Sequence, residues 1–213
     1  MDGTSQTDRA HEVTYVEQDD PIAISTSDAS ITDQDGLIRE LTVTLTNPLD
    51  NEGGTVYEYL TAPTASVLGW LATRNITAQG NGTGDDGLTD ATQIVFTASG
   101  EGSDATNFQI ALRGVGYQNI DDAMNVTADR VVHVTATDVD GNVGVDSDTT
   151  ITLTPVNDAP NSLNSSILTI EDTTYAFDLA DFQYNDSTDT GTGATANTIA
   201  AVRIASLPDS GTL

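Results

Sequence analysis

Residues 37–47 read "LIRELTVTLTN", and apolar residues alternate with threonines along this stretch. Leu41, Val43 and Leu45 fall on one face, and the threonines between them fall on the other. A period of two residues is typical of a β-strand with one buried face. β-branched residues such as Val and Thr also favour the extended backbone of a strand. The stretch therefore predicts a half-buried strand.

The same alternation recurs elsewhere in the chain. Further strands are predicted at "VTYVEQ" (13–18), "PIAIS" (21–25), "ATQIVFTAS" (91–99), "RVVHVTATD" (130–138) and "DTTITLTPV" (148–156). Segments rich in Gly, Asp and Asn separate these strands, and such segments favour turns. Many short strands between turns predict an all-β fold, an antiparallel β-sandwich.

One segment departs from this pattern. In residues 103–117, Ala105, Phe108 and Leu112 recur at helical spacing. Ser103 or Asp104 can cap the start of this helix, and Gly114 suits its end. We therefore expect one short helix beside the sandwich. The only Trp, Trp70, lies among apolar neighbours, so we expect it in the core.

Composition narrows the classes of function. The chain has 33 acidic residues and six basic ones, and its formal net charge is −27. Such a field repels nucleic acid and anionic membranes but attracts divalent cations, so we expect no nucleic-acid partner. The chain has no Cys, which excludes disulfides and Cys-ligated metals. Its apolar runs are too short to span a bilayer, so we expect no membrane insertion.

The two ends of the chain echo each other. "TYVEQDDPIAIS" (14–25) resembles "LTIEDTTYAFDL" (168–179), which places Glu17 opposite Glu171. "ITDQDG" then falls opposite "YNDSTD", which places Asp33 opposite Asp186, and "LIRELTVTLTNP" falls opposite "TIAAVRIASLPD". Three blocks in the same order indicate tandem modules.

This repeat predicts the domain organisation. Residues 1–12 would be a leader or linker, 13–156 one complete module, 157–160 a linker, and 161–213 the first strands of a second module. The second part is too short to bury a core of its own. We therefore expect a piece of a longer protein, or a subunit whose missing strands are donated by another chain.

Acidic and amide side chains collect where the two ends of a sandwich would lie. The end that holds the "DQDG" and "DVDGN" turns would carry Asp33, Asp35, Asp138 and Asp140. The opposite end would carry Glu17, Asn157 and Asp158, with "NIDD" (119–122) beside them. Ca²⁺ takes six to eight oxygen ligands, and gathered carboxylates repel one another unless a cation neutralises them. The pattern predicts calcium at both ends.

These acids have two other interpretations. Asp-x-Asp-Gly is also good turn chemistry, because Asp accepts hydrogen bonds from the backbone of its own turn. The "DVDGN" stretch begins like an EF-hand loop, but Thr149 stands where that loop needs its twelfth-position glutamate. An EF-hand is therefore excluded, and turn capping remains the alternative to calcium.

The motifs "FQIALRGVGYQN", "TATDVDG" and "VNDAP", in that order, resemble the cadherin-like repeats of large bacterial surface and secreted adhesins. The resemblance covers nearly all of residues 13–160, and it implies an Ig-like or cadherin-like β-sandwich with calcium at its junctions. It implies that Glu17, Asn157 and Asp158 form the internal junction with Asp186 and Asp189. It also implies that Asp33, Asp35 and Asp138 face a preceding module, and that one or two ions bind at a junction.

The resemblance implies a non-catalytic adhesive module, located outside the cell or on a bacterial surface, whose partners are neighbouring modules. Other copies of the chain and surface glycans are further candidate partners. A sugar- or ice-binding sandwich is an alternative because of the Thr-rich strands, although aromatic residues are only 5% of the chain. No nucleophile, phosphate-binding or paired-His motif points to an enzyme.

Overall fold

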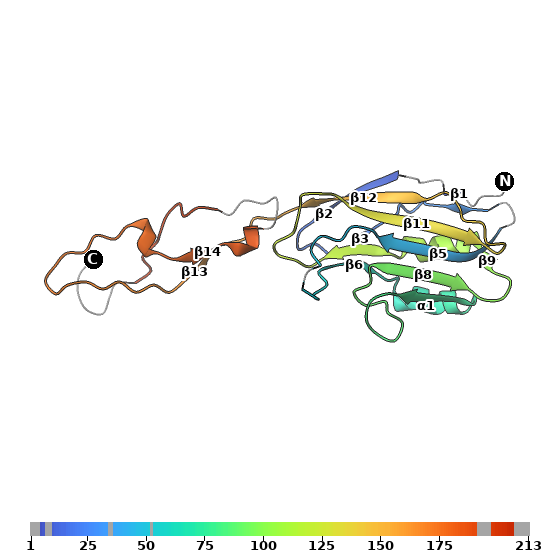
Figure 1. The fold of residues 1–213 in the computed structure, drawn as a ribbon, viewed down its shortest axis with the longest axis horizontal. Helices are drawn as coiled ribbons and strands as arrows, with labels where there is room; N and C mark the ends of the chain where they lie inside the picture. The colour runs from blue at the N-terminus through green and yellow to red at the C-terminus, as the bar shows by residue number, and fades with distance from the viewer. Residues whose placement is uncertain (1–4, 7–9, 34–35, 52, 191–196, 207–213) are drawn as a thin grey trace.

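The computed structural model describes residues 5–6, 10–33, 36–51, 53–190 and 197–206. Most of the regular structure in these residues is β, and they also form two α-helices. Figure 1 shows the arrangement of the strands. The largest sheet runs in the order β2 (Ala10–Val16), β12 (Ser147–Thr154), β11 (Arg130–Asp138), β5 (Leu37–Leu45), β8 (Gln93–Ala98) and β7 (Ile76–Gly80), and β9 (Ser103–Asp104) also pairs with β5. A smaller sheet contains β3 (Ile22–Ala23), β10 (Gly116–Asn119) and β6 (Glu58–Thr61).

The predicted strands form at the expected places, and β5 lies inside the large sheet between β11 and β8. Leu41, Val43 and Leu45 are buried as their alternation predicts, because they belong to the single apolar core. Residues of both sheets and of α2 contribute to this core. The β-rich prediction is therefore confirmed at the level of secondary structure.

The sheet is mixed, which corrects the prediction of purely antiparallel strands. β2 pairs with β12 in parallel, with Val13 opposite Ile151. The two strands are far apart in the sequence, so no hairpin forces them to run in opposite directions. Strand β2 also begins at Ala10, so the pairing includes residues that were expected to be a leader.

The helix count is a second correction, because two α-helices form where one was predicted. Helix α2 (Ala105–Arg113) has Asp104 and Gly114 at its ends, as expected, but the Asp104 side chain forms no capping hydrogen bond. Helix α1 (Ala65–Ala72) is the unpredicted one, and the Thr64 hydroxyl accepts its first-turn N–H bond from Val67. Trp70 lies on α1, half-buried against the core, with the guanidinium of Arg74 3.5 Å from its ring centre. No described helix is long and apolar enough to cross a membrane.

Residues beyond 160 extend from the end of the large sheet as a separate, slender segment (Figure 1). Its only described regular elements are β13 (Asn161–Ser162), β14 (Tyr184–Asn185) and the 3₁₀ turns η1 (Leu179–Asp181) and η2 (Ser187–Thr190). Apolar side chains in this segment are exposed to solvent, with Leu168 99% and Ile170 78% exposed. The predicted second module therefore has few strand pairs and no core of its own among its described residues.

Two local structures recur at both ends of the chain. Residues 16–19 and 170–173 form the same turn, in which the N–H of the fourth residue donates to the carbonyl of the first at 3.1 and 3.3 Å. Gln18 and Asp172, at the third position, both have positive φ angles, of 66° and 57°. This turn holds Glu17 in one copy and Glu171 in the other.

The second recurrence is a two-residue strand pair. β4 (Ile31–Thr32) pairs antiparallel with β1 (Ser5–Gln6), and β14 pairs in the same way with β13. The residue after each pair is an aspartate, Asp33 or Asp186, and each has one buried carboxylate oxygen without a hydrogen-bond partner. The sequence echo thus has a structural counterpart in its first two blocks.

Hydrogen exchange should distinguish the two parts of the chain. We expect amides in β5 and β11 to exchange only on global unfolding, because they lie in interior strands of the large sheet. Amides at residues 164–170 form few backbone hydrogen bonds. They should therefore exchange about a thousandfold faster or more. Comparable protection in both regions would contradict the exposed, coreless character of the C-terminal segment.

Candidate functional site

The linker after β12 brings together acidic side chains from both parts of the chain. The junction cluster, as we define it, contains Glu17, Asp122, Asn157, Asp158, Asp186 and Asp189. Glu17 and Asp122 precede the linker, Asn157 and Asp158 lie in it, and the last two follow β14. The cluster therefore joins groups that are up to 172 residues apart in the sequence, from 17 to 189.

Glu17 is the most buried acid of this cluster, with 4% of its surface exposed. Its Oε2 accepts a hydrogen bond from the Val156 N–H at 2.6 Å. Its Oε1 is buried and has no partner. Burial raises the pKa of Glu17, and the carboxylates of Asp158, Asp122 and Asp189 raise it further, against the lowering effect of the Val156 N–H.

The linker side chains connect this glutamate to the C-terminal segment. The Gln18 amide donates to both carboxylate oxygens of Asp158, each at 3.1 Å. The Asp158 N–H in turn donates to Asp189 Oδ1 at 2.9 Å, and Asn157 Nδ2 donates to the other Asp189 oxygen at 3.4 Å. Asp189, at 6% exposure, is thus held against the linker by two donors.

Asn197, in the C-terminal segment, joins the linker to Asp186 and Asp189. Its Nδ2 donates to Asn157 Oδ1 at 2.9 Å and to Asp189 Oδ2 at 3.3 Å, and its N–H donates to Asp186 Oδ2 at 2.7 Å. The other oxygen of Asp186 is buried without a partner, like Glu17 Oε1. Asn197 could not be identified from the sequence, because it follows a Gly- and Thr-rich stretch that matches no motif.

A buried carboxylate oxygen without a donor is costly, because its desolvation is not compensated. Two such oxygens in one acidic cluster are what a bound cation would neutralise. Carboxylate and amide oxygens are also the ligand types that Ca²⁺ prefers. Across the described residues, however, no three acidic or histidine side chains are already gathered in the geometry of a metal site. Ligation would require these side chains to converge further.

The opposite end of the large sheet carries the other predicted ligands. Asp138 uses both carboxylate oxygens within its own turn: Oδ1 accepts from the N–H groups of Asp140 and Asn142, and Oδ2 from Asn142 Nδ2. The hydrogen bond from the Asn142 side chain lowers the pKa of Asp138. Turn capping, the alternative interpretation, therefore describes the hydrogen bonds of Asp138 in this structure.

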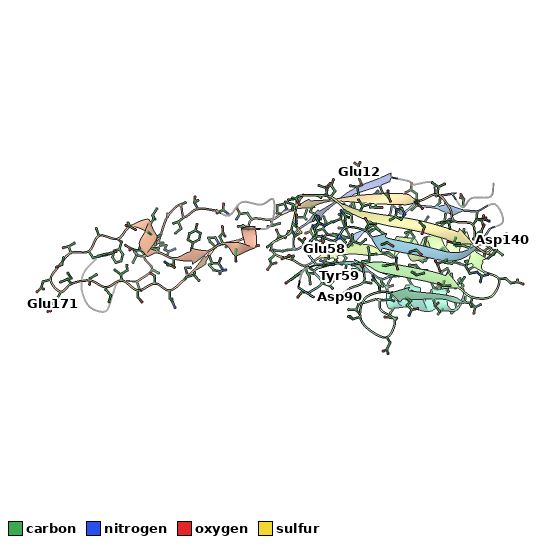
Figure 2. The ribbon with its side chains drawn as sticks, viewed as in Figure 1. Glu12, Glu58, Tyr59, Asp90, Asp140 and Glu171 are labelled. Carbon is green, nitrogen blue, oxygen red and sulfur yellow. The ribbon has the colours of Figure 1, made fainter. Side chains whose placement is uncertain are left out.

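Asp33 and Asp140 differ from Asp138 at this end. Asp33 has a buried oxygen without a hydrogen-bond partner, whereas Asp140 is exposed. Asp35 lies outside the described residues. Glu171 is exposed at the far tip of the C-terminal segment, at the opposite extreme of the molecule from Asp140 (Figure 2). Glu171 is therefore not part of the junction cluster, although its turn matches that of Glu17.

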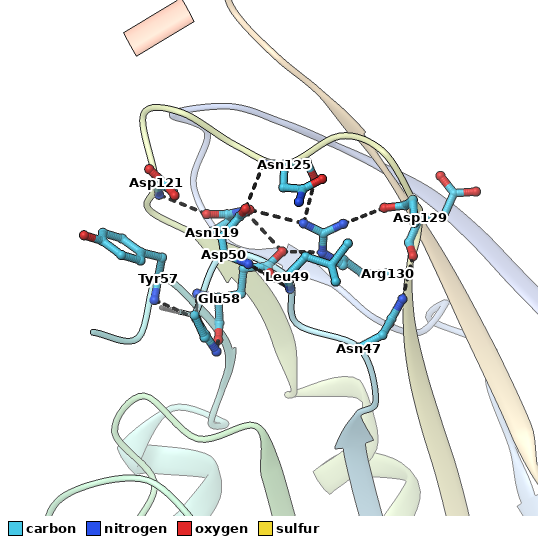
Figure 3. Close-up of polar contacts among 12 residues, drawn as sticks. Asn47, Leu49, Asp50, Tyr57, Glu58, Asn119, Asp121, Asn125, Asp129 and Arg130 are labelled. Carbon is cyan, nitrogen blue, oxygen red and sulfur yellow. Dashed lines mark hydrogen bonds and ion pairs between the residues drawn. The ribbon is translucent and has the colours of Figure 1, made fainter. Parts of the chain in front are cut away.

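A buried polar network surrounds Arg130 (Figure 3). Arg130 is fully buried and forms ion pairs with Glu58, at 2.5 Å, and with Asp50, at 3.2 Å. The Tyr117 hydroxyl donates to the same Glu58 oxygen at 2.7 Å. Burial raises the pKa of Tyr117, and the negative charge of Glu58 raises it further.

This network fixes the loop that carries Asp122. Asp50 accepts hydrogen bonds from the Asn119 side chain and the Asn125 N–H, each at 2.8 Å, and Arg130 donates to the Asn125 carbonyl at 2.7 Å. Both ends of the loop between Asn119 and Asn125 are therefore tied to buried charges. The network is structural in its contacts, and it positions one acid of the junction cluster.

Tyr15 ties the Glu17 turn to the same loop. Its hydroxyl donates to the Asn119 carbonyl at 2.6 Å, and Gln118 Nε2 donates both to this hydroxyl and to the Asp19 carbonyl. Tyr15 also packs edge-to-face on Tyr117, with ring centres 5.4 Å apart. The elements on the N-terminal side of the junction are thus connected through buried side chains.

Sequence reasoning missed this network, although one signal was available. Residues 130, 132, 134, 136 and 138 of β11 are all buried, and alternation from Val132 and Val134 places Arg130 on the same inward face. A buried Arg needs acidic partners. Those partners, Asp50 and Glu58, come from a different part of the chain, and no pattern in the sequence distinguishes them from the other 31 acids.

A scan of the chain against protein-family models finds no match, and neither does a search of curated proteins. Functional inference therefore depends on the residues and their geometry.

Proposed function

We propose that this protein is a non-catalytic structural module of a large secreted or cell-surface protein, built as tandem Ig-like or cadherin-like β-sandwiches. Ca²⁺ at the junction would hold adjacent modules in a fixed orientation. The observation that carries the proposal is the pair of buried oxygens without partners, Glu17 Oε1 and Asp186 Oδ1, on opposite sides of the linker.

Several features of the fold support this architecture. The large sheet and the three-stranded sheet contribute to one core, as the two layers of a sandwich do. The Glu17 turn recurs at Glu171, and the strand pair before Asp33 recurs before Asp186. Such recurrence is expected where successive modules repeat the same half-sites at equivalent positions.

The ligands follow from this arrangement. Glu17 and Asp122 of the first module would bind the Ca²⁺ ion through their carboxylates. In the linker, Asp158 would bind it through its carboxylate and Asn157 through its amide oxygen. Asp186 and Asp189 would bind from the segment beyond. Because the ion would contact both sides, its removal would release the acids to repel one another. Asp33, with its buried oxygen, would offer an equivalent half-site to a preceding module.

Calcium addition should raise stability and restrict the orientation of the C-terminal segment. At a free Ca²⁺ concentration about 100 times the dissociation constant, linkage predicts about 2.7 kcal/mol of added stability. For a chain of this size that corresponds to a melting temperature higher by roughly 5–10 °C. Calorimetry with Ca²⁺ and with EDTA measures the shift, and small-angle scattering should show a narrower distribution of lengths with Ca²⁺.

Magnesium at the same ionic strength is the control for general screening of the −27 charge. A specific calcium site predicts a much smaller effect of Mg²⁺, which keeps its waters and demands stricter geometry. Equal shifts with both ions would indicate screening alone. Unchanged melting and scattering with Ca²⁺ would refute the proposal.

A further inference from the structure

The first and last strands of the large sheet, in chain order, lie side by side and run in the same direction. β2 pairs with β12 in parallel along its 7 residues, from Ala10 opposite Asp148 to Val16 opposite Thr154. The Glu17 N–H continues this pairing with a hydrogen bond to the Thr154 carbonyl at 3.0 Å. The chain therefore enters β2 at one end of this strand pair and leaves β12 at the other end.

A pull applied through the chain on either side of this strand pair would act along the strands. Figure 1 shows β12 lying along the long axis of the molecule, with the C-terminal segment continuing beyond it. At about 3.3 Å per residue the pairing extends over roughly 20 Å, and a lengthwise pull loads all of its hydrogen bonds at once. A pull across the strands would load the residue pairs one after another. The resistance of this pairing to force therefore depends on direction.

Strand β12 is also held on its other side. It pairs antiparallel with β11, from Arg130 opposite Ile151 to Val134 opposite Ser147, and β11 pairs in turn with β5. Strand β2, by contrast, lies at the edge of the large sheet and has no second partner strand among the described residues. Sliding of β2 along β12 is therefore the step at which the module would yield to a lengthwise pull.

Tyr15 opposes this sliding from the inner face of β2. Its side chain is fully buried, and its ring packs edge-to-face on Tyr117 of the smaller sheet. Its hydroxyl donates to the Asn119 carbonyl at 2.6 Å and accepts from Gln118 Nε2 at 2.9 Å. Movement of β2 along β12 would break these hydrogen bonds and withdraw a packed aromatic ring from the core.

We infer that β2 and β12 form a mechanical clamp, a strand pair that keeps the module folded under tension applied along its length. Force would pass from the chain before β2, through the clamp, to the linker after β12. The clamp itself depends only on the strand pairing and on Tyr15. That tension reaches the module in use rests on its proposed place in a cell-surface protein.

Single-molecule force spectroscopy of the full chain in EDTA compares two directions of pull. The chain has no Cys, so introduced cysteines define the attachment points. Thr154→Cys supplies one attachment at the end of β12, where the side chain is exposed. The second attachment is a peptide tag at the N-terminus for the lengthwise pull. For the crosswise pull it is Asp20→Cys, an exposed position shortly after β2.

The lengthwise pull should unfold the module at a force at least about twofold higher than the crosswise pull, because the residue pairs share the load. The short pair of β1 with β4 precedes the clamp and should open first, at low force. The main step should lengthen the tether by about 450–500 Å, the extended length of residues 10–154 less their folded span.

Tyr15→Phe tests the side-chain contribution to the clamp. It keeps the ring and removes the hydrogen bonds of the hydroxyl, so it should raise the lengthwise unfolding rate at constant force about threefold to tenfold. Tyr175→Phe is the matched control. It removes a hydroxyl that donates to Asp181 at 2.8 Å, but it lies beyond the Thr154 attachment and should leave the rate unchanged.

Equal forces in the two directions would overturn the inference, as would an early low-force step in which β2 alone detaches. If Thr154→Cys lowers the melting temperature, Leu168→Cys replaces it as the attachment, because Leu168 is 99% exposed. Both pulls are made in EDTA, so their result does not depend on calcium. Equal forces would therefore refute the clamp alone, whereas unchanged melting with Ca²⁺ would refute the calcium junction alone.

Discussion

Replacing Arg130 with leucine should lower the free energy of unfolding by about 3–5 kcal/mol, the usual effect of breaking a buried ion pair on one side. The guanidinium is fully buried and contacts both Glu58 and Asp50. Without it, two carboxylates would stay in the core with less than their full set of donors. Urea unfolding followed by circular dichroism measures the loss.

A matched surface change tests whether burial is the cause. Arg74→Ala removes an arginine that lies over the Trp70 ring at the surface of α1, and it should lower stability by about 1 kcal/mol or less. The combined variant Arg130→Met, Glu58→Gln and Asp50→Asn should recover part of the loss, because no unpaired charge remains. A loss below about 1 kcal/mol for Arg130→Leu would contradict the importance of the network.

Glu17→Gln should change the free energy of unfolding in opposite directions with and without calcium. Gln keeps an oxygen for the Val156 N–H but removes the charge that burial and neighbouring acids disfavour. In EDTA at neutral pH, the variant should therefore be more stable than the original chain. With Ca²⁺, it should lose most of the roughly 2.7 kcal/mol that the ion supplies at 100 times its dissociation constant.

The pH dependence of this difference has a defined sign. Because the pKa of Glu17 is raised in the folded chain above its ordinary value of 4.5, the folded state holds this proton more tightly than the unfolded state. The protonated Glu17 side chain therefore adds to the free energy of unfolding. This contribution is full below pH 4.5 and is lost as pH rises through the raised pKa. Glu17→Gln should thus gain stability over the original chain progressively above pH 4.5 in EDTA.

Asp138→Asn serves as a control of opposite sign. The pKa of Asp138 is lowered, chiefly by the Asn142 side chain, so its contribution is present above its ordinary pKa of 3.8 and is lost as pH falls. This variant should be less stable than the original chain at neutral pH in EDTA. If Glu17→Gln behaved in the same way, the carboxylate of Glu17 would be stabilising without metal, and the need for a cation would disappear.

Much of the fold could be predicted from local pattern. β11 covers the residues of "RVVHVTATD", and Leu41, Val43 and Leu45 are buried as their alternation requires. Helix α1 was missed because its apolar residues nearly surround it and give little contrast between faces. The parallel pairing of β2 with β12 was missed because it joins opposite ends of the module, and no turn chemistry specifies it.

The candidate site, too, could be predicted where it depends on local pattern and not where it depends on long-range packing. The acids of the linker and of the echoed blocks could be identified from the sequence, because Asp and Asn at turns and boundaries are visible there. Most of the groups that hold these acids in place could not be identified from the sequence. Asn197 and the Arg130 network reach the junction only through long-range packing, since their hydrogen-bond partners lie tens of positions away. Asp122 had been placed at this end of the sandwich as part of "NIDD" (119–122).

By itself, the sequence determined the β-rich class, the position of α2, the tandem echo and the concentration of acids near the linker. These features depend on period, turn residues and composition, which act locally along the chain. Only the tertiary structure decided which oxygens are buried, which of them have donors, and which apolar side chains remain exposed. Those properties depend on what surrounds each atom in space, and desolvation, rather than residue type, separates a capped turn at Asp138 from a candidate cation site at Glu17.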